Sequence, residues 1–186
     1  IVSKNNILVQ NERLSRCKMT AVQHANGRDW WLVKPHNEKH QFFIFRVTPD
    51  SIYGPFVQSL NLPDAIEPSA NGQSCFSPDG NWYAHTQYAD RGVYVNRFDR
   101  CTGLMEFYHF YPIIVSDTAQ SNISRGLAFS SNSQFLYTDT YYDLYQFDIT
   151  DTSSNSQVCV FKPDSLQYNQ SAGYHAMQLA PNNKIY

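Results

Sequence analysis

Three polar residues are the candidate ligand-binding groups of this sequence: Gln73, Arg125 and His175. Each stands near the start of a short segment that we expect to be a strand, so a fold that repeats this strand would bring the three side chains to one place. An amide, a guanidinium and an imidazole could together bind a polar ligand there. The alternative is that Arg125 and His175 only donate hydrogen bonds to nearby backbone carbonyl groups.

No metal site, cofactor site or set of catalytic residues is assigned. The segment from His36 to His40 holds two histidines and a glutamate, but a zinc peptidase needs the order HExxH on a helix, so we expect a solvated hairpin tip. The aspartates in predicted turns lack the D-x-D-x-D-G order of a calcium loop, and each has a sufficient role in capping its turn. They are Asp79, Asp99, Asp148 and Asp151. We therefore expect no cofactor and no metal.

Composition and missing motifs argue against several other function classes. The sequence has no G-x-S-x-G elbow, no P-loop and no glycine-rich dinucleotide turn. Its net charge of -2, without a long Lys/Arg cluster, argues against nucleic acid as a partner. No run reaches the roughly 18 apolar residues of a membrane-spanning helix, so we expect no membrane span.

A polar turn between two apolar segments recurs along the chain and predicts the fold. It is found at His24–Trp31 (HANGRDWW), Phe76–Tyr83 (FSPDGNWY), Phe129–Leu136 (FSSNSQFL) and Leu179–Tyr186 (LAPNNKIY), with spacings of 52, 53 and 50 residues. Asn-Gly, Asp-Gly and similar pairs in these turns favour hairpins. A hairpin that recurs at one interval is typical of a repeat architecture.

A second marker follows each turn and completes a four-stranded unit. Alternating segments at Gln41–Val47, Val93–Phe98 and Leu144–Ile149 run into Thr/Asp/Gly turns, and a further strand follows each of them. Units of about 50 residues with four antiparallel strands are typical of β-propeller blades. A β-sandwich is the alternative, but it does not require the same turn at a regular interval.

We therefore predict an all-β fold, a β-propeller of which the chain holds about three and a half four-stranded blades. The expected boundaries are the end of a preceding blade at 1–18, blades at 19–61, 73–111 and 124–161, and the start of the next blade at 174–186. Because a propeller closes on itself, we expect the remainder of a longer polypeptide to complete it.

The cysteines and the repeated aromatic residues have open interpretations. The chain has four cysteines, without a CxxC pair. We favour a disulfide between Cys75 and Cys101, which we expect beside turns on one face, and the alternative is four buried free thiols. The aromatic residues of the repeat could stack on sugars, but we expect most of them to fill the space between blades. They are Trp30, Trp31, Trp82, Tyr83 and Tyr137.

The repeated phrases resemble, in order, the WD40-like or YVTN-like propeller region of secreted Bacteroidota proteins that bear type IX secretion sorting domains, often with PKD or Ig-like modules. They are NGRDWW at 26–31, CFSPDGNWYA at 75–84, FDRCTG at 98–103, GLAFSSNSQFLY at 126–137, YQFDIT at 145–150 and QLAPNNKIY at 178–186. The resemblance implies secretion or a place on the cell surface, and O-glycosylation of Asp-Ser/Thr triplets at Ser51, Thr118 and Ser165. It implies no catalytic residues.

We expect a non-catalytic exported propeller module for adhesion, surface assembly or protein interaction, with a protein or a surface glycan as partner. One alternative is a propeller enzyme, lactonase-like or glycan-cleaving, with its site at the mouth of the central channel. Another is a structural subunit of an extracellular assembly. An enzyme would show convergent ionisable side chains with shifted pKa values around one pocket.

Overall fold

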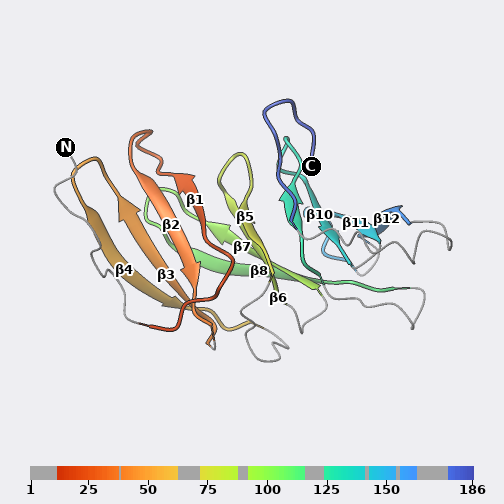
Figure 1. Ribbon diagram of the computed structural model, residues 1–186, viewed down its shortest axis with the longest axis horizontal. Helices are drawn as coiled ribbons and strands as arrows, with labels where there is room; N and C mark the ends of the chain where they lie inside the picture. Colours follow the sequence, from red (N-terminus) through yellow and green to blue (C-terminus); the bar gives the residue numbers. More distant parts are fainter. Residues whose placement is uncertain are drawn as a thin grey trace.

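The described residues form three antiparallel four-stranded sheets (Figure 1). The structure, a computed structural model, describes residues 12–37, 39–62, 72–87, 92–115, 124–140, 143–153, 156–162 and 176–186. Within these ranges the assigned secondary-structure elements are all β-strands. None of the described residues forms a helix long and apolar enough to cross a membrane.

Each sheet consists of four strands that are consecutive in sequence. Blade 1 holds β1 (Thr20–Gln23), β2 (Trp30–Pro35), β3 (Gln41–Val47) and β4 (Ile52–Ser59). Blade 2 holds β5 (Ser74–Phe76), β6 (Trp82–Gln87), β7 (Gly92–Phe98) and β8 (Met105–Pro112). Blade 3 holds β9 (Leu127–Phe129), β10 (Phe135–Asp139), β11 (Leu144–Asp148) and β12 (Gln157–Phe161).

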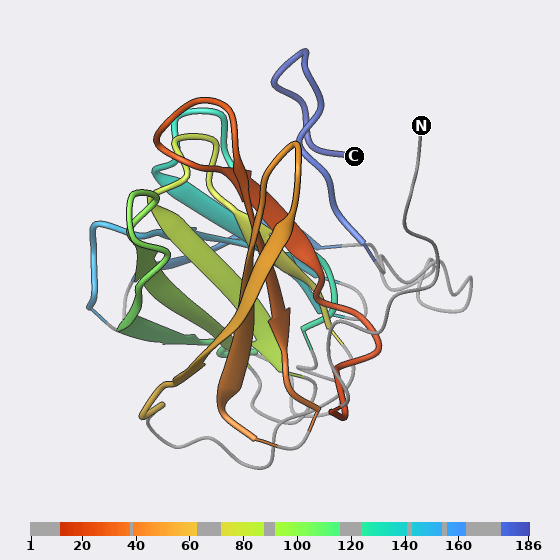
Figure 2. The same ribbon diagram turned by 90° about the vertical axis from the view of Figure 1, so that its left-hand side faces the viewer.

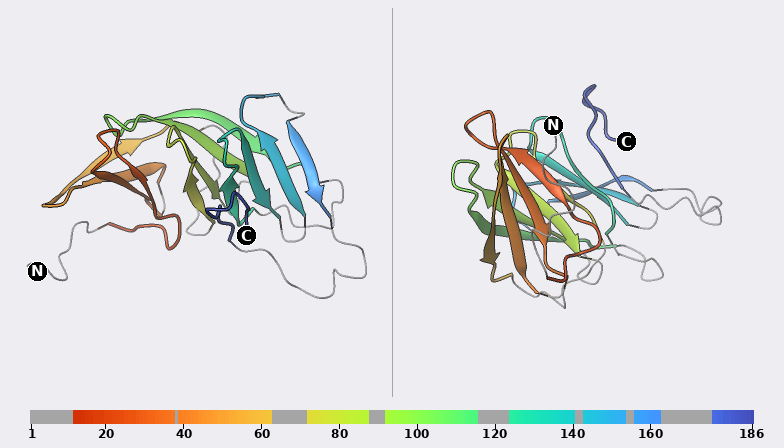
Figure 3. Two further views of the ribbon diagram at one scale, coloured as in Figure 1. Left: turned by 90° about the horizontal axis from the view of Figure 1, so that it is seen from above. Right: turned by 60° about the vertical axis from the view of Figure 1, so that its left-hand side comes forward.

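The three sheets stand face to face in a curved row, as the views in Figures 2 and 3 show. The first strands of the blades are neighbours, since β1 contacts β5 and β5 contacts β9. Blades that meet along their first strands and stack through their faces are arranged as in a propeller. The prediction of an all-β partial propeller is confirmed.

The repeated turn has a defined backbone conformation. We count the turn from the residue whose carbonyl accepts its closing hydrogen bond: His24, Ser77, Ser130 or Ala180. The fourth residue of the turn takes a positive φ in each copy, at Gly27 (72°), Gly80 (75°), Ser133 (62°) and Asn183 (62°). In each copy this residue's N–H donates to the carbonyl three positions earlier, as Gly80 does to Ser77 at 2.8 Å. Glycine and asparagine tolerate this left-handed conformation, which explains why the sequence places such residues there. Gly27 therefore aligns with Gly80, so our first spacing of 52 residues was wrong by one.

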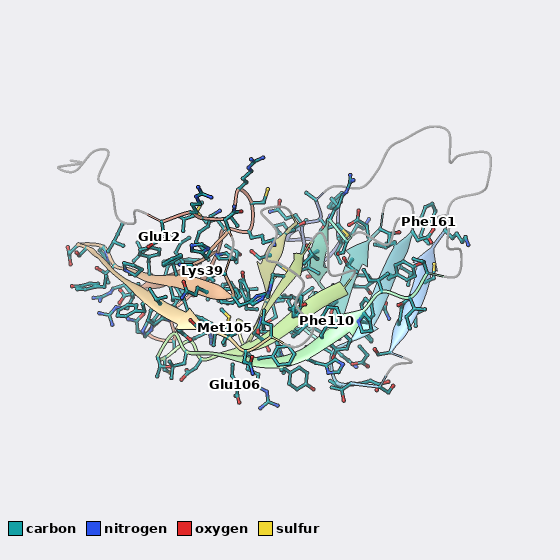
Figure 4. All side chains as sticks on the ribbon, turned by 90° about the horizontal axis from the view of Figure 1, so that it is seen from below. Glu12, Lys39, Met105, Glu106, Phe110 and Phe161 are labelled. Atoms are coloured by element: carbon teal, nitrogen blue, oxygen red, sulfur yellow. The ribbon has the colours of Figure 1, made fainter. Side chains whose placement is uncertain are left out.

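Two apolar clusters hold neighbouring blades together. Between blades 1 and 2 lie Val22, Trp31, Val33, Phe42, Ile44, Tyr83, Phe98 and Met105. Between blades 2 and 3 lie Ala84, Val93, Val95, Tyr111, Ile113, Leu127, Phe129, Leu136, Tyr145, Phe147 and Ile149. Figure 4 shows Met105 among the side chains between the sheets, whereas the next residue, Glu106, points outward. This alternation gives each strand one face per neighbouring blade.

The repeated aromatic residues divide between buried and exposed positions. Trp31 and Tyr83 are buried in the cluster between blades 1 and 2. Trp82 and Tyr137 are half-buried, and Trp30 keeps 47% of its surface exposed. The expected filling of the space between blades therefore holds fully for Trp31 and Tyr83.

The segments before β1 and after β12 extend the pattern. Leu14 pairs with His36 beside blade 1, and Leu179 pairs with Ile185 in a hairpin that repeats the turn. Residues 1–11 lie outside the described residues. The expectation that His36 sits at a solvated tip was wrong, because its side chain is buried and its ring lies 6.0 Å from that of Phe43. The pairing with Leu14 covers this end of the hairpin.

Candidate functional site

A groove of about 720 Å³ runs along the first strands of the blades. Its walls come from β1, β5, β9 and the segment around Met177 to Leu179, so it follows the axis around which the blades stand. Arg100 is the only Lys, Arg, Asp or Glu among its lining residues. Cys75 also lines it, but burial raises the pKa of this thiol to about 12, so it is not a thiolate nucleophile at neutral pH. The lining therefore offers one charged side chain and no carboxylate.

Gln73 stands immediately before β5, with both its amide oxygen and its amide nitrogen bonded to backbone groups. Its Oε1 accepts hydrogen bonds from the N–H groups of Leu127 and Met177, both at 3.0 Å. Its Nε2 donates to the carbonyl of Met177 at 2.6 Å. The structure thus places this predicted ligand-binding residue at the channel as a link between strands.

Arg125 stands just before β9 in blade 3. Its guanidinium favours ionisation of the nearby Asp139, the last residue of β10. His175 lies outside the described residues. Of the three predicted residues, the structure therefore brings Gln73 and Arg125 to the same end of neighbouring first strands.

Asp139 is the acid that sequence reasoning missed. Its Oδ1 accepts a hydrogen bond from the N–H of Gly126, and its Oδ2 is buried without a hydrogen-bond partner among the described residues. Burial raises the pKa of this carboxyl to about 6, although the bond from Gly126 and the charge of Arg125 both act to lower it. A buried carboxylic acid with a pKa near neutrality and a free oxygen can take up and release a proton.

The sequence held one signal for Asp139. The second strand of blade 2 has Thr86 at the matching place, 53 residues earlier, where a polar residue also contacts the start of the first strand: Thr86 Oγ1 accepts from the N–H of Gln73 at 3.0 Å. An ionisable residue in place of this threonine departs from the repeat. A comparison of units position by position would have found it.

Lys18 adds a second cationic group at this end. It is 6% exposed, and its Cε lies 3.2 Å from where a Cβ on Gly72 would stand. Gly72 is the blade 2 counterpart of Arg125, 53 residues earlier. The stem of Lys18 therefore fills the side-chain space that Gly72 leaves open, and two successive blades present a cation beside their first strands.

A second buried acid, Asp143, lies in the same β10–β11 hairpin but contacts a different face of the sheet. Its Oδ2 accepts a 3.0 Å hydrogen bond from the Tyr145 hydroxyl. Tyr145 belongs to the cluster between blades 2 and 3, whereas Asp139 adjoins Met177 on the other side. The two carboxyl groups are thus parts of different surroundings.

The predicted modification sites meet different outcomes. All four cysteines are free, so the expected Cys75–Cys101 bond is not formed: Cys75 lies on an inner strand and Cys101 in the exposed β7–β8 turn. Ser51 is half-buried in the β3–β4 turn, while Thr118 and Ser165 lie outside the described residues. O-glycosylation stays a prediction. Among the described residues no three His, Cys, Asp or Glu side chains are placed to hold a metal ion.

Comparison with known proteins identifies the fold. No protein-family model matches the sequence, and no curated protein matches it. The chain is similar to a candidate 6-phosphogluconolactonase from Bacteroides uniformis ATCC 8492, with a TM-score of 0.55 and 18% identity over 91% of this chain and 45% of that one. It is similar to the Swd1 β-propeller domain of Myceliophteria thermophila, with a TM-score of 0.54 and 14% identity over 86% and 43%. It also resembles the periplasmic gluconolactonase PpgL of Pseudomonas aeruginosa, with a TM-score of 0.50 and 15% identity over 78% and 38%.

These similarities establish a propeller fold and correct one expectation. The chain spans less than half the length of each of these structures, with shares of 45%, 43% and 38%. Two of the three are described as lactonases, which are enzymes. This finding overturns our expectation of a non-catalytic module for adhesion, surface assembly or protein interaction, and it favours the lactonase-like alternative.

Proposed function

We propose that the protein is a lactonase-like hydrolase whose acid–base group is Asp139. The observation that carries the proposal is the buried Asp139 carboxyl, whose pKa is raised to about 6 and whose Oδ2 has no hydrogen-bond partner within the described ranges. Support also comes from the lactonase descriptions of two propeller neighbours. Because one fold hosts many functions, the site and not the fold carries the argument.

The reaction follows from the groups around Asp139. Near neutral pH Asp139 is mainly a carboxylate, so it can accept a proton from the water that attacks the lactone carbonyl. The charge of Arg125, which acts on Asp139, would stabilise the oxyanion that forms as the water oxygen bonds to carbon. When the ring C–O bond breaks, Asp139 returns the proton to the leaving alkoxide. The product is one hydroxy acid, and no cofactor is consumed.

The substrate class and the location are also proposals. We propose a sugar-acid lactone, because the site offers a cation and hydrogen-bonding groups for a polar, acidic molecule. The periplasmic location of one neighbour supports export of this protein as well. The resemblance to secreted Bacteroidota proteins with type IX sorting domains supports the same location and stays a proposal.

Hydrolysis of glucono-1,5-lactone and of its 6-phosphate by the purified full-length protein, followed by acid release at constant pH, tests the proposal. We expect Asp139→Asn to lower kcat by about 10²-fold or more, and Arg125→Gln to lower kcat as well, because it removes a charge that stabilises the oxyanion. Asp143→Asn is the matched control, because it removes a buried carboxyl from the same hairpin and should keep kcat. Equal losses in Asp139→Asn and Asp143→Asn, or no hydrolysis by the wild type, would reject it.

A further inference from the structure

Side-chain amides of three glutamines join neighbouring blades by imitating strand pairing. Gln58 of β4 donates to the carbonyl of Gly103 and accepts from the N–H of Met105, both at 2.8 Å. Gln157 of β12 donates to the carbonyl of Ile114 at 2.7 Å and accepts from its N–H at 2.8 Å. Each amide thus offers one donor and one acceptor to a backbone edge of the next blade, as a strand would.

Gln73 makes the same kind of link at the centre of the molecule, with one more bond. It connects blade 2 to Leu127 of blade 3 and to both backbone groups of Met177 in the segment that follows. Its own backbone is fixed, since Thr86 N–H donates to the Gln73 carbonyl at 3.0 Å and Thr86 Oγ1 accepts from the Gln73 N–H at 3.0 Å. The side chain therefore extends from a fixed backbone and links Leu127 and Met177 to it.

The two segments that Gln73 links, β9 at Leu127 and the segment at Met177, are the walls around Asp139. Leu127 directly follows Gly126, whose N–H donates to Asp139 Oδ1. Met177 closes the other side: a Cβ added to Gly126 would lie 2.9 Å from Asp139 Oδ1 and 3.2 Å from Cγ and Cε of Met177. The spacing of these walls decides how much water reaches the carboxyl.

We propose that Gln73 is a positioning residue: its amide holds Leu127 and Met177 at the separation that keeps Asp139 enclosed and its Oδ1 bonded to Gly126. This inference rests on the proposed function, because it assigns Gln73 a role toward the acid–base group of that site. Gln73 itself touches no reacting atom. It acts through the backbone of Leu127 and Met177, as supporting residues around reactive groups do.

The proposal predicts how Asp139 responds when the link is removed. Burial is the main cause of its raised pKa. In Gln73→Leu, which keeps a side chain of similar size but no amide, more water should reach the carboxyl, and its pKa should fall from about 6 toward 3.8. The N–H groups of Leu127 and Met177 should exchange with solvent about tenfold faster or more.

Gln58→Leu is the matched control, because it removes an amide link of the same kind far from Asp139. Carboxyl carbon NMR, with Asp139 assigned by comparison with Asp139→Asn, follows the titration in both variants. Amide hydrogen exchange follows Leu127 and Met177. We expect both quantities to change in Gln73→Leu and to stay at the wild-type value in Gln58→Leu, even where the two variants lose equal stability.

The outcomes separate this inference from the proposed function. An unchanged Asp139 titration in a folded Gln73→Leu variant overturns the positioning role, whatever the lactone assay gives. A shifted titration in a protein that hydrolyses no lactone supports the positioning role and rejects the activity. Should Gln73→Leu fail to fold, wild-type exchange decides: slow exchange of Leu127 and Met177 supports the link, and exchange as fast as that of the exposed turn residue Thr102 rejects it.

Discussion

The indole N–H of Trp31 donates a 2.8 Å hydrogen bond to the backbone carbonyl of Arg100. Trp31 lies on the second strand of blade 1, and Arg100 lies in the β7–β8 turn of blade 2. The same carbonyl accepts the N–H of Ala25 at 3.1 Å, so the first turn of one blade is fixed to an outer turn of the next. One buried side chain thus sets the distance between two sheets by packing and by a directional bond.

We expect Trp31→Phe to lower the free energy of unfolding by about 2 kcal/mol, because it removes this hydrogen bond and part of a ring that is 3% exposed. Trp30→Phe is the control, since Trp30 is 47% exposed, and its change should stay within about 0.5 kcal/mol. Urea unfolding of the three proteins measures both. A similar loss in the two variants would contradict the assigned role of Trp31.

Gly103 packs against the same ring. Its φ is 75°, and an added Cβ would lie 2.8 Å from two ring carbons of Trp31. Gly27 has a φ of 72° with nothing within 4 Å of such a Cβ. We expect Gly27→Ala to cost about 1 kcal/mol from backbone strain alone, and Gly103→Ala to cost about 1–3 kcal/mol more. Equal melting temperatures for the two variants would show that the ring yields freely.

The sequence was sufficient for the blades because their signals are local and repeated. A turn that needs a left-handed residue must hold Gly, Asn or a tolerant Ser, and Gly27, Gly80, Ser133 and Asn183 satisfy that need. Strand alternation then assigns faces to neighbouring blades. The register at the first turn was off by one because the aromatic pair Trp30–Trp31 has two possible alignments with Trp82–Tyr83.

The site was harder to predict because its chemistry depends on enclosure. Asp139 has the sequence context of an ordinary strand-end residue, and its raised pKa arises from burial among segments that lie far apart in sequence, such as those of Gly126 and Met177. Gln73 lines the groove and its ligand-binding role stays a prediction; which backbone groups its amide contacts depends on separations between segments that no local pattern encodes. The non-catalytic reading followed from the missing local motifs, yet a site assembled from several strands needs none.

His85 should make stability sensitive to mild acid. It is 1% exposed and stacked on Tyr94 with ring centroids 5.2 Å apart, and in the part of the chain that the structure describes neither ring nitrogen has a hydrogen-bond partner. Burial, with the positive charges of Lys18 and His40, holds its pKa well below 6.5. Above pH 6.5 both folded and unfolded states keep it neutral; below, only the unfolded state takes up the proton, so stability is lost as pH falls.

The size of this effect can be measured with His85→Phe, which keeps an aromatic ring in the cluster. The wild type should lose about 2 kcal/mol through His85 between pH 7.5 and pH 5. The variant should not lose this stability. On acidification, the unfolding free energy of the variant should therefore rise relative to that of the wild type. A gap that stays constant with pH would mean that His85 is protonated in the folded state.

Asp139 should have the opposite pH dependence, and here stability and activity oppose each other. Its pKa is 3.8 ordinarily and about 6 in the folded protein. Below 3.8 both states hold the proton; between the two values only the folded state does; above 6 the folded state carries a buried charge. Stability from this group is therefore full at low pH and lost as pH rises through 6.

Asp139→Asn removes that dependence while its Oδ1 can still accept the Gly126 N–H. Between pH 4 and pH 7 the unfolding free energy of the wild type should fall by about 2 kcal/mol relative to the variant, as measured by urea unfolding at each pH. Parallel pH profiles would show that the carboxyl is hydrated and has an ordinary pKa. If the two pH profiles of unfolding free energy converge or cross, the wild type keeps at neutral pH a charged group that costs stability. Such a cost is expected of a residue kept for proton transfer rather than for packing.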